Sequence, residues 1–274
     1  MEYEGRLPKE GINTSSEHPL RELALLLGGF VAVAVAVTLL AALLVDRLVP
    51  LLPPDLEVRL FASWLSHAVL AEEDADPRRA GVQALLERMA GHWSGHPYDF
   101  RVGVIPDAET NAFALPGGWI FVTSGLLDRA ASENELALVL GHELGHYHAR
   151  DHLRGLGRGV ALTAVLAALG SDVAGSLASL GVELTARRFG RDQERAADAF
   201  GLALLHAEYG HVAGADALFA RMAASEDAGG TGRFAAYLST HPLHAQRVDA
   251  LRAHAQAQGW SGDGALRPLV WKLE

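Results

Sequence analysis

Residues 23–45 form an unbroken apolar run without a charged side chain, LALLLGGFVAVAVAVTLLAALLV. A helix of this length spans a hydrocarbon core of about 30 Å. The run exceeds the ~7–15-residue apolar core of a signal peptide, and Asp46-Arg47 follow it without a small-residue cleavage site. We therefore expect a transmembrane helix, with a cleaved signal peptide and a buried core helix as the alternatives. The predicted organisation is an N-terminal tail over 1–22, a membrane anchor over 23–45 and a folded domain over 46–274.

The basic residues on the two sides of this run give a slight orientation signal. Arg6, Lys9 and Arg21 precede it, while Arg47 and Arg59 follow within about fifteen residues. Because positive charge favours the cytoplasmic side, we expect a cytoplasmic N-terminus with most of the chain across the membrane, which in a bacterium would be the periplasm. The lipid membrane is therefore a predicted partner.

Charge and cysteine usage narrow the remaining possibilities. The formal net charge is −10, and no basic run is present, so we expect no nucleic-acid partner. The chain has no cysteine, so a metal site would have to be built from histidines and carboxylates.

Apolar periodicity predicts a mainly helical domain with a small sheet. Helices are expected over 56–71, 77–89, 132–150, 192–205 and 212–224, and again after His241-Pro242. Strands are expected over 100–105, 111–115 and 119–123, with the last two joined as a hairpin by Pro116-Gly117-Gly118. The predicted fold class is therefore α+β, preceded by one transmembrane helix.

Residues 155–186 are rich in Gly, Ala and Leu but contain Asp172 and Glu183. This composition predicts an apolar helical hairpin, packed on the core or in contact with the membrane. The internal charges make a second full span the less favoured alternative.

The segment His142-Glu143-Leu144-Gly145-His146 has the H-E-x-x-H pattern. On a helix the two histidines lie one turn apart on the same face, so both imidazoles can reach one zinc ion. Glu143 lies beside them and can hold a water against the metal, which predicts a general base. The bare motif also occurs by chance and needs further support.

A catalytic zinc needs three protein ligands and an open position, and Glu194 is the candidate third ligand. Asp198 follows it by four residues on the same helical face, where it can accept the free ring N–H of a metal-bound histidine. The alternative is an ordinary solvated face, because Arg191 and Arg195 are interspersed.

Taken in order, these segments resemble the HtpX-like and CAAX-prenyl-protease type of membrane zinc metallopeptidases, which are gluzincins. The matching positions are 111–118, 125–127, 135–137, 142–146, 194–198, 240–242 and Arg247. The resemblance implies a zincin-like fold, one zinc ion per chain held by His142, His146 and Glu194, and Glu143 as base, next to a membrane. Members with several spans have further transmembrane helices, whereas this chain has one clear apolar run.

Two further side chains are candidates for stabilising a developing oxyanion, His241 and Arg247. For His241 the alternative is a capping or packing role before Pro242. For Arg247 the alternative is an ion pair with an acid in the core.

An extended peptide substrate is expected to add as a strand beside the predicted sheet. The candidate substrate-binding residues are Asn111, Ala112, Phe113, Ala114, Gly117 and Gly118. For the glycines, turn chemistry is an equally good explanation. His148 and His152 are also four residues apart, but they point about 240° away from His142 on the helix, so we expect both to be exposed.

The pattern favours a zinc-dependent endopeptidase acting on membrane-associated or misfolded envelope proteins. A membrane-tethered binding or assembly factor with a structural or occluded zinc is the alternative from another class. Processing of prenylated proteins is a lower alternative, because it normally goes with a chamber made by several spans. The oligomeric state is not predicted.

Overall fold

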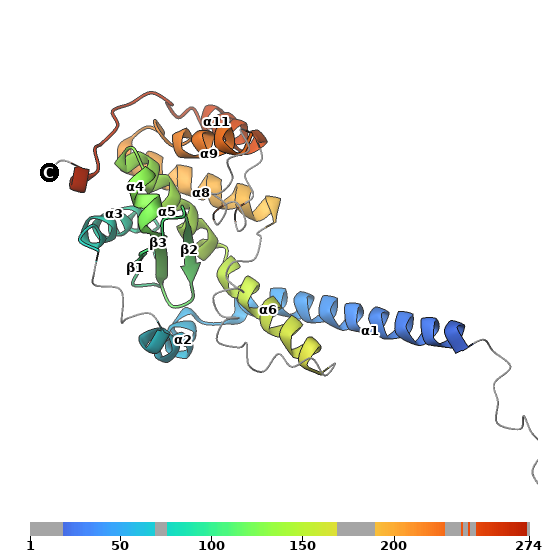
Figure 1. The fold of residues 1–274 in the computed structure, drawn as a ribbon. Helices are drawn as coiled ribbons and strands as arrows, with labels where there is room; N and C mark the ends of the chain where they lie inside the picture. Colours follow the sequence, from blue (N-terminus) through green and yellow to red (C-terminus); the bar gives the residue numbers. More distant parts are fainter. Residues whose placement is uncertain are drawn as a thin grey trace, which may run out of the picture.

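The computed structural model describes residues 19–68, 76–168, 190–227, 237, 241 and 245–272. Its N-terminal helices are α1 (Pro19–Leu48), the 3-10 turn η1 (Val49–Leu51), α2 (Pro54–Ala68) and α3 (Arg79–Gly91). The strands β1 (Arg101–Ile105), β2 (Ala112–Leu115) and β3 (Trp119–Thr123) follow. The later elements are α4 (Ser124–Arg129), α5 (Glu133–His148), α6 (Asp151–Ala168), α8 (Arg191–Tyr209), α9 (Ala217–Asp227), α11 (Ala245–Ala257) and η4 (Val270–Lys272). The predicted fold class, mainly helical with a small sheet and one N-terminal apolar helix, is confirmed (Figure 1).

The sheet has the strand order β1-β3-β2, with β1 parallel and β2 antiparallel to β3. The predicted hairpin is present, and its turn depends on Gly117 and Gly118, whose φ angles of 90° and 92° favour glycine. β2 is an edge of this sheet, and it packs beside α5. A further peptide strand therefore has an edge to pair with.

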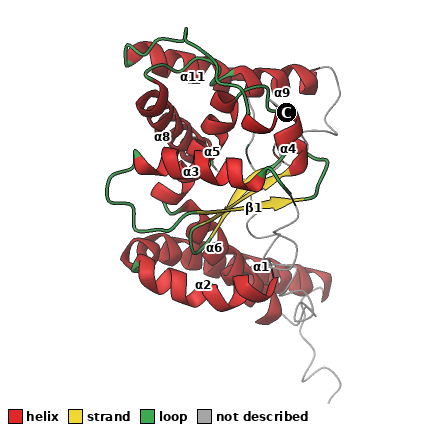
Figure 2. Cartoon of the chain, turned by 90° about the vertical axis from the view of Figure 1, so that its left-hand side faces the viewer, coloured by secondary structure: helices red, strands yellow, loops and turns green. Residues whose placement is uncertain are grey.

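The helix α5 is the centre of the domain, and every residue from Glu133 to Tyr147 is buried. It begins as predicted, with the Ser132 hydroxyl accepting a hydrogen bond from the Glu135 N–H at 3.3 Å. α5 packs against α8 on one side and against α3 and β2 on others (Figure 2). Two glycines allow the helices to approach closely, because a Cβ at Gly145 would lie 2.6 Å from the Ala197 Cα and one at Gly141 would lie 3.0 Å from the Gly201 Cα.

The helix α1 extends away from this domain (Figure 1) and is apolar on all sides. Among the described residues it is the one helix long and apolar enough to cross a membrane, over Leu20–Leu51, and its apolar window is 0% buried. The N-terminal part of α6 packs against its C-terminal end, where Arg158 forms an ion pair with Asp46 at 2.6 Å. Figure 2 shows α1, α2 and α6 together at one end of the molecule, with the sheet between them and α8.

Several predicted boundaries differ from the observed ones. The helix expected to run to Arg150 ends at His148, because Arg150 adopts a φ of 57° and turns the chain into α6. The helix expected from 212 begins at Ala217, after a turn in which Gly214 has a φ of 81°. Of the predicted hairpin over 155–186, α6 covers the first part, and residues 169–186 lie outside the described residues.

Candidate metal centre

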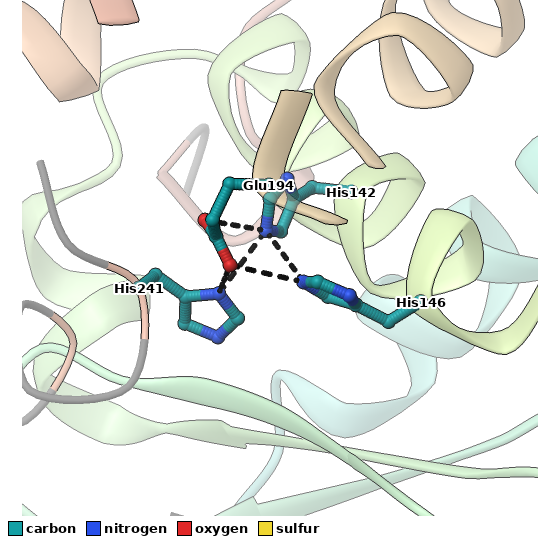
Figure 3. Close-up of side chains that lie close together, drawn as sticks. All are labelled: His142, His146, Glu194 and His241. Carbon is teal, nitrogen blue, oxygen red and sulfur yellow. Dashed lines mark hydrogen bonds and ion pairs between the residues drawn. The ribbon is translucent and has the colours of Figure 1, made fainter. Parts of the chain in front are cut away.

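Four side chains from three parts of the chain bring nitrogen and oxygen atoms to one point. They are His142 and His146 from α5, Glu194 from α8, and His241, and their donor atoms all lie within 4.8 Å of one another (Figure 3). The Nε2 atoms of the two α5 histidines are 3.1 Å apart. The Glu194 carboxylate lies 3.4 Å from the His146 Nε2 and 3.6 Å from the His142 Nε2. The three ligands expected from the sequence therefore converge, joined by His241 as a fourth donor.

The outer ring nitrogen of His142 has a carboxylate partner, as expected from the spacing of α8. The His142 Nδ1–H donates to the Asp198 Oδ1 at 2.8 Å. Burial acts to raise the pKa of Asp198, but the charge of Arg247 and the hydrogen bonds from His142 and Arg247 lower the pKa to about 2. Because an ionised carboxylate can only accept, the His142 proton is fixed on Nδ1 and the Nε2 lone pair faces the centre.

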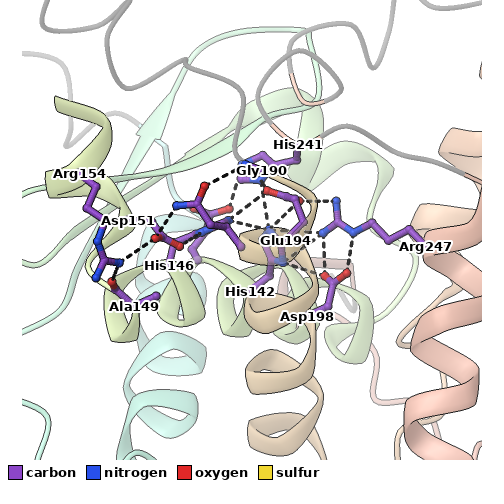
Figure 4. Close-up of polar contacts among 12 residues, drawn as sticks. His142, His146, Ala149, Asp151, Arg154, Gly190, Glu194, Asp198, His241 and Arg247 are labelled. Carbon is purple, nitrogen blue, oxygen red and sulfur yellow. Dashed lines mark hydrogen bonds and ion pairs between the residues drawn. The ribbon is translucent and has the colours of Figure 1, made fainter. Parts of the chain in front are cut away.

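Asp151 gives the same support to His146, and sequence reasoning missed it. The His146 Nδ1–H donates to the Asp151 Oδ2 at 3.1 Å, and Gln193 of α8 donates to the Asp151 Oδ1 at 2.6 Å (Figure 4). Asp151 opens α6 only because the chain turns at Arg150. If α5 continued to residue 150, as predicted, Asp151 would not reach His146. The one sequence feature that could have indicated this contact is an acidic residue five positions after a candidate ligand.

This arrangement fits a divalent metal ion. With both Nδ1 protons given to carboxylates, two Nε2 lone pairs face each other at 3.1 Å, an arrangement that a shared cation stabilises. Imidazole nitrogen with carboxylate oxygen is a donor set that suits zinc and other first-row divalent ions. His142, His146, Glu194 and His241 are each at most 4% exposed, so the centre is closed in this structure.

Glu143 is buried beside the donors and is 1% exposed. Its Oε1 lies 3.5 Å from the His241 Nε2 and accepts no hydrogen bond within the described part of the chain. A buried carboxylate oxygen without a hydrogen bond is costly unless a water or substrate proton occupies it, as a general base requires.

His241 and Arg247 lie at the centre, but their contacts differ. The His241 Nδ1 is 3.1 Å from both the Glu194 Oε1 and the His142 Nε2, and its ring stacks on Tyr237. Arg247 donates to Asp198 at 2.6 and 2.7 Å and pairs with the Glu194 Oε2 at 2.7 Å. Arg247 thus shows the alternative expected for it, an ion pair with buried acids.

The candidate substrate-binding residues separate into two groups. Asn111, Ala112, Phe113 and Ala114 lie at or on the edge strand, with Asn111 and Phe113 partly exposed. The N–H groups of the turn glycines are already used, since Gly117 donates to the Glu57 Oε1 and Gly118 to the Tyr147 Oη. This favours the turn-chemistry explanation for the glycines.

One prediction about the remaining histidines is wrong. His148 is exposed as expected, but His152 is 3% exposed, and its Nε2 lies 3.0 Å from the Glu57 Oε1. The prediction assumed one continuous helix through His152. Because α5 ends at His148 and His152 lies in α6, its side chain points in a different direction from the one expected.

Comparison with known proteins gives a consistent family assignment. Residues 76–255 match the model of peptidase family M48. The chain is 34% identical to the mitochondrial metalloendopeptidase OMA1 of Schizosaccharomyces pombe over 178 residues, covering 63% of this chain and 51% of that protein. It is 32% identical to the metalloprotease LoiP of Escherichia coli over 187 residues (65% and 71%) and 28% identical to the metalloprotease YcaL of E. coli over 175 residues (61% and 66%).

The chain therefore spans about half the length of the OMA1 relative and about two thirds or more of the two E. coli relatives. The broad resemblance to metallopeptidases of the HtpX-like type is confirmed at the level of the family, without support for the prenyl-protease branch in particular. The matched residues include both helices that carry the candidate ligands, and the chain belongs to peptidase family M48.

Proposed function

We propose that this protein is a membrane-anchored zinc endopeptidase with one zinc ion held by His142, His146 and Glu194. The observation that carries the proposal is the pair of imidazoles whose Nδ1 atoms are held by Asp198 and Asp151 and whose Nε2 atoms converge on Glu194. When bound, zinc would polarise the scissile carbonyl and acidify a water molecule at the site.

The remaining steps belong to the side chains of the protein. Glu143 takes a proton from the attacking water at Oε1, which accepts no hydrogen bond from the described residues, and passes it to the leaving amine. His241 can donate to a developing oxyanion when its ring moves away from Glu194. Arg247 holds Asp198 and Glu194 in place, which makes it a positioning residue rather than an oxyanion donor.

The substrate is proposed to be a peptide that pairs in an extended conformation with the outer edge of β2, which pairs with no other strand among the described residues and lies next to the metal-bearing helix. Main-chain pairing gives loose side-chain selectivity, which suits membrane-associated or misfolded envelope proteins. Several spans forming a chamber would be needed for prenyl-protein processing, which is why it remains the lower alternative.

The placement at a membrane is part of the same proposal. α1 has exposed leucines on all sides, including Leu26 at 72% and Leu40 at 68%. The Asp46–Arg158 ion pair lies where the apolar run of α1 ends and that of α6 begins, so it marks a polar boundary at the membrane surface. The metallopeptidase domain would then lie on the side reached after α1, the periplasm in a bacterium.

One observation favours a second candidate, a tethered binding factor with an occluded metal. His241 adds a fourth donor beside the three proposed ligands, and all four side chains are nearly inaccessible. A fully ligated metal would have no position for water.

Replacement of Glu143 by Gln tests the proposal in detergent-solubilised full-length protein. We expect wild type and Glu87→Gln, which changes an exposed glutamate of α3, to cleave casein. Glu143→Gln should bind zinc normally but lose about 10²–10⁴-fold in activity. Unchanged cleavage by Glu143→Gln would contradict the proposed base, whereas zinc binding without cleavage by the wild type would favour the occluded-site candidate.

A further inference from the structure

Glu57 is a completely buried carboxylate in α2, outside the residues that match the family. Its Oε2 accepts from the Tyr98 hydroxyl at 2.7 Å and from Arg150 at 3.2 Å. Its Oε1 accepts from the Gly117 N–H at 3.0 Å and lies 3.0 Å from the His152 Nε2. Burial acts to raise the pKa of Glu57, but hydrogen bonds from His152, Tyr98 and Gly117 and the charge of His152 lower the pKa to about 2, so the group is ionised at neutral pH.

The hydrogen bond from Gly117 to Glu57 fixes the turn of the β2–β3 hairpin. Gly117 donates to Glu57, and the adjacent Gly118 donates to the Tyr147 Oη at 2.9 Å. Tyr147 follows the proposed ligand His146 directly in α5. The end of the edge strand is therefore held between the helix α2, which follows the apolar anchor, and the metal-bearing helix.

The contacts of Glu57 with Arg150 and His152 fix the junction between α5 and α6. Arg150 and His152 both bind Glu57, and Arg150 also donates to the main-chain oxygens of Val49 and Leu52 beside the anchor. Asp151, between them in sequence, points the other way, to the His146 Nδ1 and to Gln193. Gln193 directly precedes Glu194, so this junction contacts both helices that supply the proposed ligands.

Glu57 could stabilise the fold alone, or it could also position the parts of the site that it contacts. Loss of a buried carboxylate with four partners destabilises any fold, because it leaves buried donors without acceptors. However, three of the four partners of Glu57 are Gly117 in the turn of the edge strand and the two neighbours of Asp151, which are the parts that the proposed reaction needs in register. Displacement of a contact behind a metal ligand typically lowers metal affinity or activity about 10–100-fold.

We propose that Glu57 is a positioning residue for peptide hydrolysis, which sets the β2 edge and the Asp151–His146 contact from the membrane-proximal helix α2. The inference rests on the proposed function, and it assigns a role in the reaction to a segment before the family domain. The segment next to the anchor and the metal centre are then parts of one polar network.

The test compares Glu57→Gln with Asp55→Asn in full-length, detergent-solubilised protein. Asp55 lies on the same helix, is exposed and pairs only with Arg59 in the described structure. Asp55→Asn therefore removes one negative charge, as Glu57→Gln does, without disturbing the buried network. We expect Asp55→Asn to behave as wild type. For Glu57→Gln we expect kcat for a peptide substrate and zinc affinity, measured by chelator competition, each to fall by up to about 10–100-fold, the loss typical when the direct hydrogen-bond partner of a metal ligand is mutated. The visible spectrum of the cobalt-substituted protein should also change, because Asp151, which orients the His146 ring, is displaced.

All measurements are made well below the melting temperature of each variant, so that the fraction folded is the same. A folded Glu57→Gln protein with wild-type kcat, zinc affinity and cobalt spectrum would overturn the inference while leaving the proposed function intact. A wild type that binds no metal would overturn both. If Glu57→Gln does not fold, His152→Phe takes its place, because a ring of similar size stays packed on Tyr147 but donates nothing to Glu57. A smaller fall in the same quantities supports the inference, and wild-type values contradict it.

Discussion

The helix pairs α5–α8 and α1–α6 are both apolar contacts, but they differ in what surrounds them. In α5–α8 the apolar and charged side chains are enclosed by protein, and backbones meet at Gly145 and Gly201. In α1–α6 the closest approach is at Gly157 against Val45, and no residue of the apolar window of α1 is buried. Burial of apolar surface stabilises both contacts, and under the proposed membrane placement a bilayer would cover the apolar surface that α1 leaves open.

The two pairs also treat charge differently. Glu194 and Asp198 of α8 are almost inaccessible in the first pair, and both are matched by the charge of Arg247, a buried residue of α11. Such groups are costly to bury and destabilise strongly when one partner is lost. In the second pair, Asp46 and Arg158 remain 34% and 41% exposed, so water weakens their attraction. The first region should therefore be sensitive to small changes and the second tolerant.

The largest difference is expected from glycine replacements. Gly145→Val adds atoms where even a Cβ would lie 2.6 Å from the Ala197 Cα, so the helices must separate at a cost of about 3 kcal/mol or more. Gly28→Val in α1 has no atom within 4 Å of the new Cβ and should leave the domain unchanged. Thermal unfolding of the two variants measures the contrast. Equal melting temperatures for Gly145→Val and Gly28→Val would show that the α5–α8 contact is no more sensitive to added volume than the exposed part of α1.

An intermediate effect is expected from Asp198→Asn. The amide can donate or accept, so it no longer fixes the His142 proton on Nδ1, and Arg247 loses an ionic partner. We expect zinc affinity to fall about 10–100-fold, while the exposed Asp249→Asn of α11 changes nothing. Chelator competition measures both. Wild-type affinity in Asp198→Asn would mean that this carboxylate does not orient the ring.

The smallest effect is expected from Arg158→Gln in the second region. The pair is partly exposed, so its loss should cost less than about 1 kcal/mol and shift the melting temperature of the domain by less than about 4 °C. A loss of folding comparable to that of Gly145→Val would show that the α1–α6 contact supports the domain as strongly as α5–α8 does.

The side-chain positions that could be predicted from the sequence are those that depend on short, regular spacing. His142 and His146, or Glu194 and Asp198, are four residues apart within one helix, so their common face follows from helical geometry. The contacts of Asp151 and His152 could not be obtained in this way, because the left-handed conformation of Arg150 breaks the helix before them. Glu57 was equally inaccessible to pattern analysis, since its partners at Tyr98, Gly117, Arg150 and His152 are 41 to 95 residues away.

Metal content in Glu194→Gln is the most direct test of the central claim that two imidazoles and one carboxylate hold a single ion. The exposed Asp192→Asn, two residues earlier on α8, is the matched control. We expect one equivalent of zinc per chain in the wild type and in Asp192→Asn, with clearly less in Glu194→Gln at the same free zinc concentration. A wild-type protein without stoichiometric metal, or a Glu194→Gln protein that binds zinc as tightly as the wild type, would contradict it.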